Sequence, residues 1–328
     1  MRAVVLVAPH QLEVVDDRPE PDCGPDDVII RMHSVGLCGT DLAAYDGKSA
    51  VPESPWVIGH EGGGEIIAVG ANVSAREVGQ RVVIEPNFGC GRCERCAAGR
   101  TSACETRVSV GFGYPGLLAE RVAVPAAYTW VVPEFSDVEL ACFEPLVVAD
   151  DAVRRAGVRE GDACLVVGAG SVGQLVCHAI MAAGGIPYVS EPHEGRRGLA
   201  LELGAHDHAA SGRSEYPFVF ETSGVGATWP LAYASVQKAG LLTLIGFGRT
   251  EVSFLPMDVV RRQITIRGHI IYDHPADFAA TIESVRAGRL HPDAAVQACF
   301  DVADAVEAFA KVRELPGKTW IDFGSWLA

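Results

Sequence analysis

Residues 162–185 constrain the fold of this chain more than any other stretch. They read DACLVVGAGSVGQLVCHAIMAAGG, an apolar strand pattern followed by a glycine turn and an apolar helix. The turn is a GxGxxG pattern, and its candidate cofactor contacts are Gly168, Gly170, Ser171, Val172 and Gly173. Such a turn lets the backbone approach a pyrophosphate, which then lies on the helix N-terminus. The strand–turn–helix context therefore predicts a dinucleotide site, which the bare pattern would indicate only weakly.

The next strand pattern, IPYVSEP, ends near Glu191, 18 residues beyond Gly173. An acid at this position accepts hydrogen bonds from the ribose hydroxyls of adenosine and repels a 2′-phosphate. NAD is therefore the predicted cofactor, in preference to NADP. Arg196 and Arg197 lie close by and weaken this preference, although both also suit a solvated helix start. Arg196 is kept as a candidate cofactor contact.

Strand and helix patterns alternate after residue 145. The strands YPFVFETSG, GLLTLIGFG and QITIRGHII extend the series, which predicts an α/β fold with a doubly wound parallel sheet. Residues 1–145 instead carry short β-branched runs between turn signals, as strands of a partly open barrel would. Between LGAHDHAASGR and YPFVFETSG we predict a loop or single turn, because a crossover helix needs at least about ten residues.

Four of the ten cysteines, Cys90, Cys93, Cys96 and Cys104, lie within fifteen residues. Thiolates bind zinc tetrahedrally, and four protein ligands leave the ion no open position. The spacing therefore predicts a structural zinc site that holds shape and binds no substrate. A redox-active or unpaired cluster is the other interpretation.

Composition limits the classes of function. The net charge is −15 and no Lys/Arg-rich block occurs, so a nucleic-acid-binding module, including a zinc ribbon, is disfavoured. No run of about 18 apolar residues suits a membrane span. The N-terminus has a short apolar run without a small-residue cleavage site, so we read it as a strand. We therefore expect a cytoplasmic protein with reduced thiols.

A second set of potential metal ligands is spread more widely along the sequence. It comprises Cys38 in VGLCGTDL, His60 and Glu61 in VIGHEGGGEI, and Glu144 in ACFEPL. A catalytic zinc needs about three protein ligands and one open position. Each of these residues also suits an ordinary structural role. Cys38 could be a small core residue, and His60 and Glu61 could be a hydrogen-bonded pair. Glu144 could be a solvated cap.

The motifs CGTD, GHEGGGEI, the four-cysteine loop, FEPL, GAGSVG and GKTWIDF occur together and in order. In this combination the whole chain resembles the zinc-dependent medium-chain dehydrogenase/reductase superfamily, and its polyol and secondary-alcohol dehydrogenases in particular. The resemblance implies a GroES-like, β-rich catalytic domain over residues 1–146 and 271–328, with a structural zinc lobe at about 86–106. Residues 147–270 would form the Rossmann NAD-binding domain.

The resemblance also implies roles for residues. Cys38, His60 and Glu144 would hold a catalytic zinc, with Glu61 nearby or as an alternating ligand, and Thr40 would pass on the substrate proton. With the four-cysteine site this makes two zinc ions per chain. The implied reaction moves a hydride between NAD(H) and a secondary alcohol, polyol or ketone. Relatives are usually homodimers or homotetramers. A zinc-free quinone or enoyl reductase and a non-catalytic zinc-binding protein are the alternatives.

Two positions depart from the family pattern. Many relatives carry a histidine where this chain has Ala43, so a proton relay ending in that imidazole is absent. Many also carry a histidine where this chain has Asp151, whose carboxylate can contact the cofactor or cap the helix DAVRRAG. We favour the cap, because acids suit helix N-termini. The aromatic side chains that could reach the substrate are expected to be mostly core: Tyr45, Trp56, Phe112, Tyr114 and Tyr272.

Overall fold

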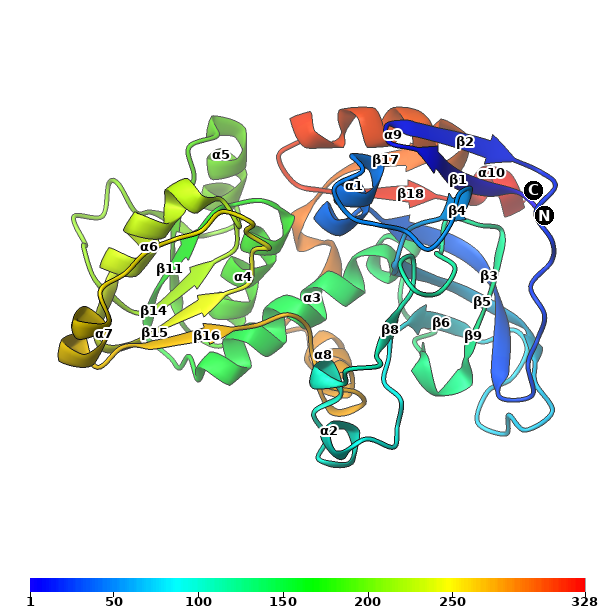
Figure 1. Ribbon diagram of the computed structural model, residues 1–328, viewed down its shortest axis with the longest axis horizontal. Coiled ribbons are helices and arrows are strands. Elements are labelled where there is room, and N and C mark those ends of the chain that lie inside the picture. Colours follow the sequence, from blue (N-terminus) through cyan, green and yellow to red (C-terminus); the bar gives the residue numbers. More distant parts are fainter. Residues whose placement is uncertain (328) are drawn as a thin grey trace. The chain divides into compact units, whose positions relative to one another are not determined.

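The computed structural model describes residues 1–327, which divide into two compact units (Figure 1). The first contains residues 1–144 and the chain from Val296 onward, and the second contains Pro145–Ala295. Residues 271–295, predicted to belong to the catalytic domain, therefore cluster with the second unit. The reason is α8 (Ala276–Arg286), which is tied to the end of α3 (Asp137–Ala156) by ion pairs from Asp277 to Arg155.

The first unit is built on a seven-stranded sheet. Its order is β10-β6-β5-β3-β18-β17, with β9 also paired to β3. The strands are β3 (Asp27–Gly36), β5 (Glu61–Val69), β6 (Arg81–Ile84), β9 (Arg121–Pro125), β10 (Thr129–Val131), β17 (Val296–Asp301) and β18 (Lys318–Asp322). Smaller sheets hold β1 (Ala3–Ala8), β2 (Gln11–Val15) and β4 (Trp56–Val57), and β7 (Asn87–Phe88) with β8 (Val108–Ser109). Alternate residues of β3 are buried, as the period of a half-covered strand requires.

Short helices complete the first unit: α1 (Gly39–Tyr45), α2 (Glu94–Ala97), α9 (Ala305–Lys311) and α10 (Gly324–Leu327). A single apolar core joins β1, β3, β5 and β6 to α9 and β18. The C-terminal strand β18 lies antiparallel beside β3, on the side opposite β5. Residues from the two ends of the sequence thus meet at the centre of this sheet, which is where the candidate site lies.

The second unit holds a six-stranded parallel sheet in the order β13-β12-β11-β14-β15-β16. The strands are β11 (Ala163–Val167), β12 (Ile186–Ser190), β13 (His206–Asp207), β14 (Tyr216–Glu221), β15 (Val236–Leu244) and β16 (Thr265–Gly268). The helices are α4 (Ser171–Ala182), α5 (Glu194–Glu202), α6 (Trp229–Ala234), α7 (Pro256–Arg262) and α8. This is the strand order of a Rossmann domain, so the predicted parallel sheet is confirmed.

The connection from β13 to β14 contains no helix between residues 208 and 215, all of which the structure describes. The predicted loop is therefore confirmed. The Arg213 guanidinium lies over the rings of Tyr188 and Tyr216, 5.5 and 5.6 Å from their centroids. This cation–π contact covers part of the sheet with one side chain instead of a helix.

Helix α3 begins earlier than the sequence indicated. Ser136 and Glu139 form a capping box at its start, with Ser136 N–H donating to the Glu139 carboxylate at 2.7 Å. Pro145 lies inside the helix and does not end it. The prediction that Asp151 caps a helix is therefore wrong: it is a buried residue of the last helical turns, paired with Arg155. Burial, and then the charge of Asp277, raise the pKa of Asp151 to about 7.

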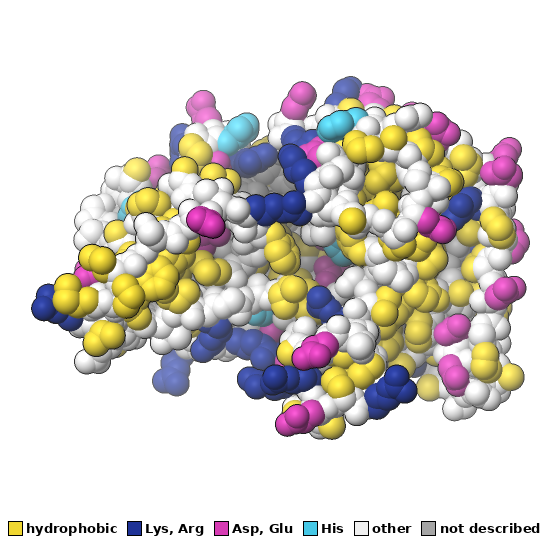
Figure 2. Space-filling model, in the orientation of Figure 1, with side chains coloured by type: hydrophobic (Ala, Val, Ile, Leu, Met, Phe, Trp, Pro, Cys, Tyr) yellow, Lys and Arg dark blue, Asp and Glu magenta, His cyan; other side chains and the backbone are white. Residues whose placement is uncertain are grey.

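The second unit also presents apolar side chains to solvent. Figure 2 shows hydrophobic atoms gathered over α6, α7 and the segment between β15 and α7. The exposed residues there include Phe247, Phe254, Leu255, Met257 and Val260. Within residues 1–327, no helix combines the length and apolar character that a bilayer crossing requires.

Candidate functional site

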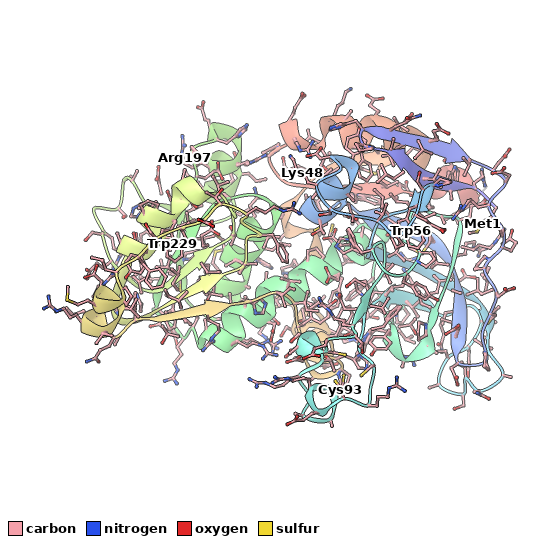
Figure 3. The ribbon with its side chains drawn as sticks, viewed as in Figure 1. Met1, Lys48, Trp56, Cys93, Arg197 and Trp229 are labelled. Atoms are coloured by element: carbon pink, nitrogen blue, oxygen red, sulfur yellow. The ribbon has the colours of Figure 1, made fainter. Side chains whose placement is uncertain are left out.

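The four predicted cysteines come together in a lobe formed by residues 90–104, where Figure 3 labels Cys93. Their sulfur atoms all lie within 4.8 Å of one another. Gly91 and Gly99 adopt positive φ angles of 68° and 70°, which bend the chain around the sulfurs at little cost. No residue of α2 is buried, so the lobe has almost no apolar core of its own.

The chemistry of this lobe fits a divalent metal. The N–H groups of Arg92 and Cys93 point at the Cys90 sulfur and lower the pKa of that thiol to about 6. Cys96 N–H likewise donates to the Cys93 sulfur at 3.4 Å. Backbone donors aimed at sulfur favour thiolates, which are the metal-binding form of cysteine. The pKa of Cys104 is lowered as well, whereas burial and then Cys93 raise that of Cys96. The four sulfur atoms, all within 4.8 Å of one another, match the ligand set of a closed zinc site.

A second group of ligand atoms lies in the main sheet of the first unit. One atom each from Cys38, His60 and Glu61 lies within 4.8 Å of the others. Cys38 is the N-cap of α1, His60 immediately precedes β5, and Glu61 begins that strand. Glu144 is not part of this group; it is a buried residue of α3, 4% exposed. The structure therefore brings together three of the four candidates.

Asp41 is a functional residue that sequence reasoning missed. Its carboxylate is fully buried, with Oδ1 3.0 Å from Nδ1 of His60. Gly59 N–H donates to the same oxygen at 3.1 Å, and Cys38 N–H donates to Oδ2 at 3.1 Å. One side chain thus fixes both His60 and Cys38, which leaves Nε2 of His60 as the ligand atom. The signal was an acid three residues after the cysteine, the capping-box position of α1.

The electrostatics of this group favour a cation. Burial by itself lowers the pKa of His60, yet Asp41 and then Cys38 raise it well above its ordinary value. The surroundings therefore stabilise positive charge at the imidazole. A zinc ion bound to neutral His60 and to the Cys38 thiolate would supply that charge, so the residues present fit the metal.

We predict that Asp41→Asn weakens zinc binding at Cys38 and His60 by about 10–100-fold, the usual effect of losing a carboxylate behind a metal-binding histidine. Competition with a chelator measures it, and the zinc of the cysteine lobe serves as an internal reference. Asp46→Asn is the matched control, because Asp46 caps the other end of α1 and pairs with Lys48. Equal zinc affinity in both variants would contradict the role of Asp41.

Other predicted residues take clear positions. The Thr40 hydroxyl lies 3.6 Å from the Cys38 sulfur, so it is placed beside the candidate metal group. Phe112 faces His60 edge-on, with ring centroids 5.8 Å apart. Trp56, labelled in Figure 3, is buried and donates to the Gly111 carbonyl at 2.9 Å. Tyr45 and Tyr272 are also buried, in agreement with the expected core role.

The glycine turn of the second unit has the form that a pyrophosphate site needs. Gly168 has a φ of 96°, and a Cβ at Gly173 would lie 2.1 Å from the Gly168 carbonyl oxygen. Gly170 is the N-cap of α4, and no atom lies within 4 Å of the place where its Cβ would be. The first and third glycines thus permit close packing, while the second leaves open space at the helix N-terminus.

Glu191 lies against this turn. Its carboxylate accepts hydrogen bonds from Ala169 N–H and His193 N–H, both at 2.8 Å. Arg196 lies in the first turn of α5, with its N–H donating to His193 Nδ1 at 3.3 Å. The guanidinium of Arg197 donates to the Glu191 carbonyl at 2.9 Å. Ser171 and Val172 begin α4, directly after the glycines. The hydrogen bond from Ala169 therefore connects Glu191 directly to the glycine turn.

Comparison with known families assigns a family to the region that contains each site. Residues 24–134 match the alcohol dehydrogenase GroES-like domain, and residues 171–287 match the zinc-binding dehydrogenase family. The first match contains the cysteine lobe together with Cys38, His60 and Glu61. The second begins at the N-terminus of α4, within the GxGxxG turn. The predicted fold class, a GroES-like domain with a Rossmann domain, is thereby confirmed.

Individual relatives cover nearly the whole chain. L-arabinitol 4-dehydrogenase of Aureobasidium melanogenum is 31% identical, over 92% of this chain and 89% of its own. The protein named "Probable D-xylulose reductase A" of Neosartorya fischeri is 30% identical, over 94% and 92%. The structure of 2R,3R-butanediol dehydrogenase from Bacillus subtilis superposes with a TM-score of 0.88 at 26% identity, covering 98% and 99%. The chain therefore belongs to the zinc-dependent medium-chain dehydrogenase/reductase superfamily and is an oxidoreductase of its alcohol and polyol dehydrogenase type.

Proposed function

We propose that this protein is a zinc- and NAD-dependent dehydrogenase of a secondary alcohol or polyol, or a reductase of the corresponding ketone. The observation that carries the proposal is the group of Cys38, His60 and Glu61, held by the buried Asp41. Cys38 and His60, together with one further carboxylate ligand, suit a zinc ion with an open position. The glycine turn and Glu191 supply the cofactor site that hydride transfer requires.

Each of these residues has a separate role in the proposed reaction. Zinc, when bound, acts as a Lewis acid that makes a hydroxyl easier to deprotonate. Cys38 and His60 hold the ion, with Glu144 as the third ligand that the family resemblance implies. Asp41 keeps the imidazole in the tautomer that binds metal. Thr40 receives the hydroxyl proton, and with Ala43 in place of a histidine the proton leaves through water or the cofactor ribose.

Zinc content separates this proposal from its main alternative. We propose two zinc ions per chain, one at the Cys38 group and one in the cysteine lobe. A zinc-free quinone or enoyl reductase would hold no zinc ion at the Cys38 group. Metal analysis of the purified protein decides: about two zinc ions support the proposal, and one or none overturns it. Failure of zinc-loaded protein to bind NADH would favour a non-catalytic role.

Glu191 supports NAD as the cofactor. We predict that Glu191→Ala lowers the ratio of kcat/KM with NAD to that with NADP by about 10–100-fold, the worth of a hydrogen bond to a charged group. Glu191→Gln keeps an acceptor for Ala169 N–H and isolates the effect of charge. Glu194→Ala is the matched control, because Glu194 is an exposed acid three residues later on α5. An unchanged ratio in Glu191→Ala would remove Glu191 from cofactor selection.

The names of the relatives support the proposed substrate class: they refer to L-arabinitol, D-xylulose and 2R,3R-butanediol. We propose a secondary hydroxyl in a polyol or diol as the group oxidised. The test is a screen of purified enzyme with NAD against sugar alcohols, cyclitols, amino alcohols and simple secondary alcohols. The reverse direction is tested with the matching ketones and NADH.

We further propose a cytoplasmic homodimer or homotetramer. A reducing compartment keeps the four lobe thiols available for metal. The apolar side chains exposed around α7 support self-association, because groups of exposed apolar side chains often mark protein–protein contacts. Light scattering gives the mass in solution; a monomer would contradict this part of the proposal.

A further inference from the structure

Glu61 is bound by a lysine from the far end of the sequence. Lys318 donates from Nζ to Oε2 of Glu61 and to the Leu37 carbonyl, the latter at 2.9 Å. Both side chains are buried, with exposures of 2% for Lys318 and 1% for Glu61. A buried ammonium and a buried carboxylate each need a partner, because neither charge is solvated. Each therefore fixes the position of the other.

Three adjacent strands build this ion pair. In the register of the sheet, Glu61 of β5 lies opposite Gly36 of β3, and Gly36 in turn lies opposite Trp320 of β18, two residues after Lys318. A Cβ at Gly36 would come within 2.6 Å of Glu61 Oε2 and 3.1 Å of Lys318 Cε. The absence of a side chain at Gly36 thus leaves the space that the pair fills.

Glu61 has a second potential partner. A carboxylate oxygen of Glu61 lies within 4.8 Å of the ligand atoms of Cys38 and His60, close enough for all three to share one ion. A carboxylate that binds the metal there occupies the position that a substrate hydroxyl requires. Lys318 and the metal therefore compete for the same side chain.

We propose that Lys318 is a positioning residue that holds Glu61 away from the catalytic zinc and so keeps a coordination position open for substrate. This inference rests on the proposed zinc site at Cys38 and His60. Without the ammonium, the buried carboxylate has the metal as its nearest positive charge and becomes a zinc ligand. Glu61 is then a reserve ligand, and its use is set by Lys318.

The experiment compares Lys318→Met with Lys318→Arg, which keeps the positive charge, and with the double variant Lys318→Met/Glu61→Gln. Each is prepared with cobalt in place of zinc, and its visible spectrum is recorded without substrate. Subtracting the spectrum of Cys38→Ser protein isolates the signal of the Cys38 group from that of the cysteine lobe. Release of zinc to a chelator is measured on the zinc-loaded forms.

We expect Lys318→Met to change the cobalt spectrum and to slow zinc release, because an added ligand holds the ion more tightly. Its kcat should fall in parallel, while Lys318→Arg stays close to the parent protein. The double variant should regain the parent cobalt spectrum, because the neutral amide neither needs the lysine nor competes for metal.

Two results overturn the inference. One is a Lys318→Met protein whose cobalt spectrum and zinc release match the parent. The other, which holds even where Lys318→Met fails to fold, is a changed spectrum in the double variant Lys318→Met/Glu61→Gln, which leaves no unpaired buried charge, because it would show that Glu61 already binds the metal. Failure of the proposed function itself looks different: the parent protein would hold one zinc ion or none.

Discussion

Cys38→Ser is expected to abolish turnover while leaving cofactor binding intact. Cys38 is the thiolate of the candidate catalytic group, and its N–H is held by Asp41. Serine is a much poorer zinc ligand at neutral pH, because its hydroxyl stays protonated. Loss of Lewis-acid stabilisation worth several kcal/mol lowers kcat/KM by about three orders of magnitude or more. Steady-state kinetics measure this loss.

Cofactor binding provides the internal check for this variant. The glycine turn and Glu191 belong to the second unit, whereas Cys38 belongs to the first, so NADH titration by fluorescence should give the parent affinity. Cys23→Ser is the matched control, since Cys23 is also a half-buried free thiol and lies in neither metal group. A Cys38→Ser enzyme that retains turnover would remove Cys38 from the mechanism.

Cys93→Ser should have the largest effect on stability. The lobe of residues 90–104 has a helix with no buried residue, so we expect it to depend on metal for its fold. In small zinc-dependent domains metal binding supplies about 10–16 kcal/mol of folding free energy. Losing one ligand should therefore release one zinc ion per chain and unfold the lobe locally. Limited proteolysis should then cut within residues 86–106, and the thermal midpoint should fall.

The same variant tests the division between the two metal groups. The zinc that remains should be the one at Cys38 and His60, so turnover per folded molecule should survive. Cys299→Ser is the control, because Cys299 is exposed and outside both groups. A folded Cys93→Ser protein with an intact lobe and no turnover would place the lobe in the chemistry, against the structural role proposed for it.

Local sequence patterns predicted those parts of the site whose residues lie close together in the sequence. The four lobe cysteines span fifteen residues, and the glycine turn is one strand–turn–helix, so spacing alone indicates their geometry. Asp41 was missed although it lies in the same motif as Cys38. Its role depends on Gly59 and His60, which approach it only through tertiary folding.

Long-range pairing and helix continuity were beyond the sequence patterns. Lys318 and Glu61 are 257 residues apart and meet only because β18 adds to the sheet beside β3. Asp151 was misplaced because an acid ahead of DAVRRAG suits a helix N-terminus, whereas α3 runs continuously through Pro145 and Asp151. Residues 271–295 cluster with the second unit for a related reason. The ion pairs between α8 and α3 join residues that are far apart in sequence, and no sequence pattern in either segment predicts them.

The short connection between β13 and β14 has a practical consequence for work on this protein. Residues 209–215 are all exposed, and the chain is fixed again at either side by His208 N–H to Val189 and Tyr216 N–H to Ser235. Closing a longer loop there costs only about 0.6 kcal/mol for each doubling of its length. A peptide tag or fluorescent label inserted after Gly212 would therefore extend an exposed loop at little cost in folding free energy, and would give an internal handle on the protein.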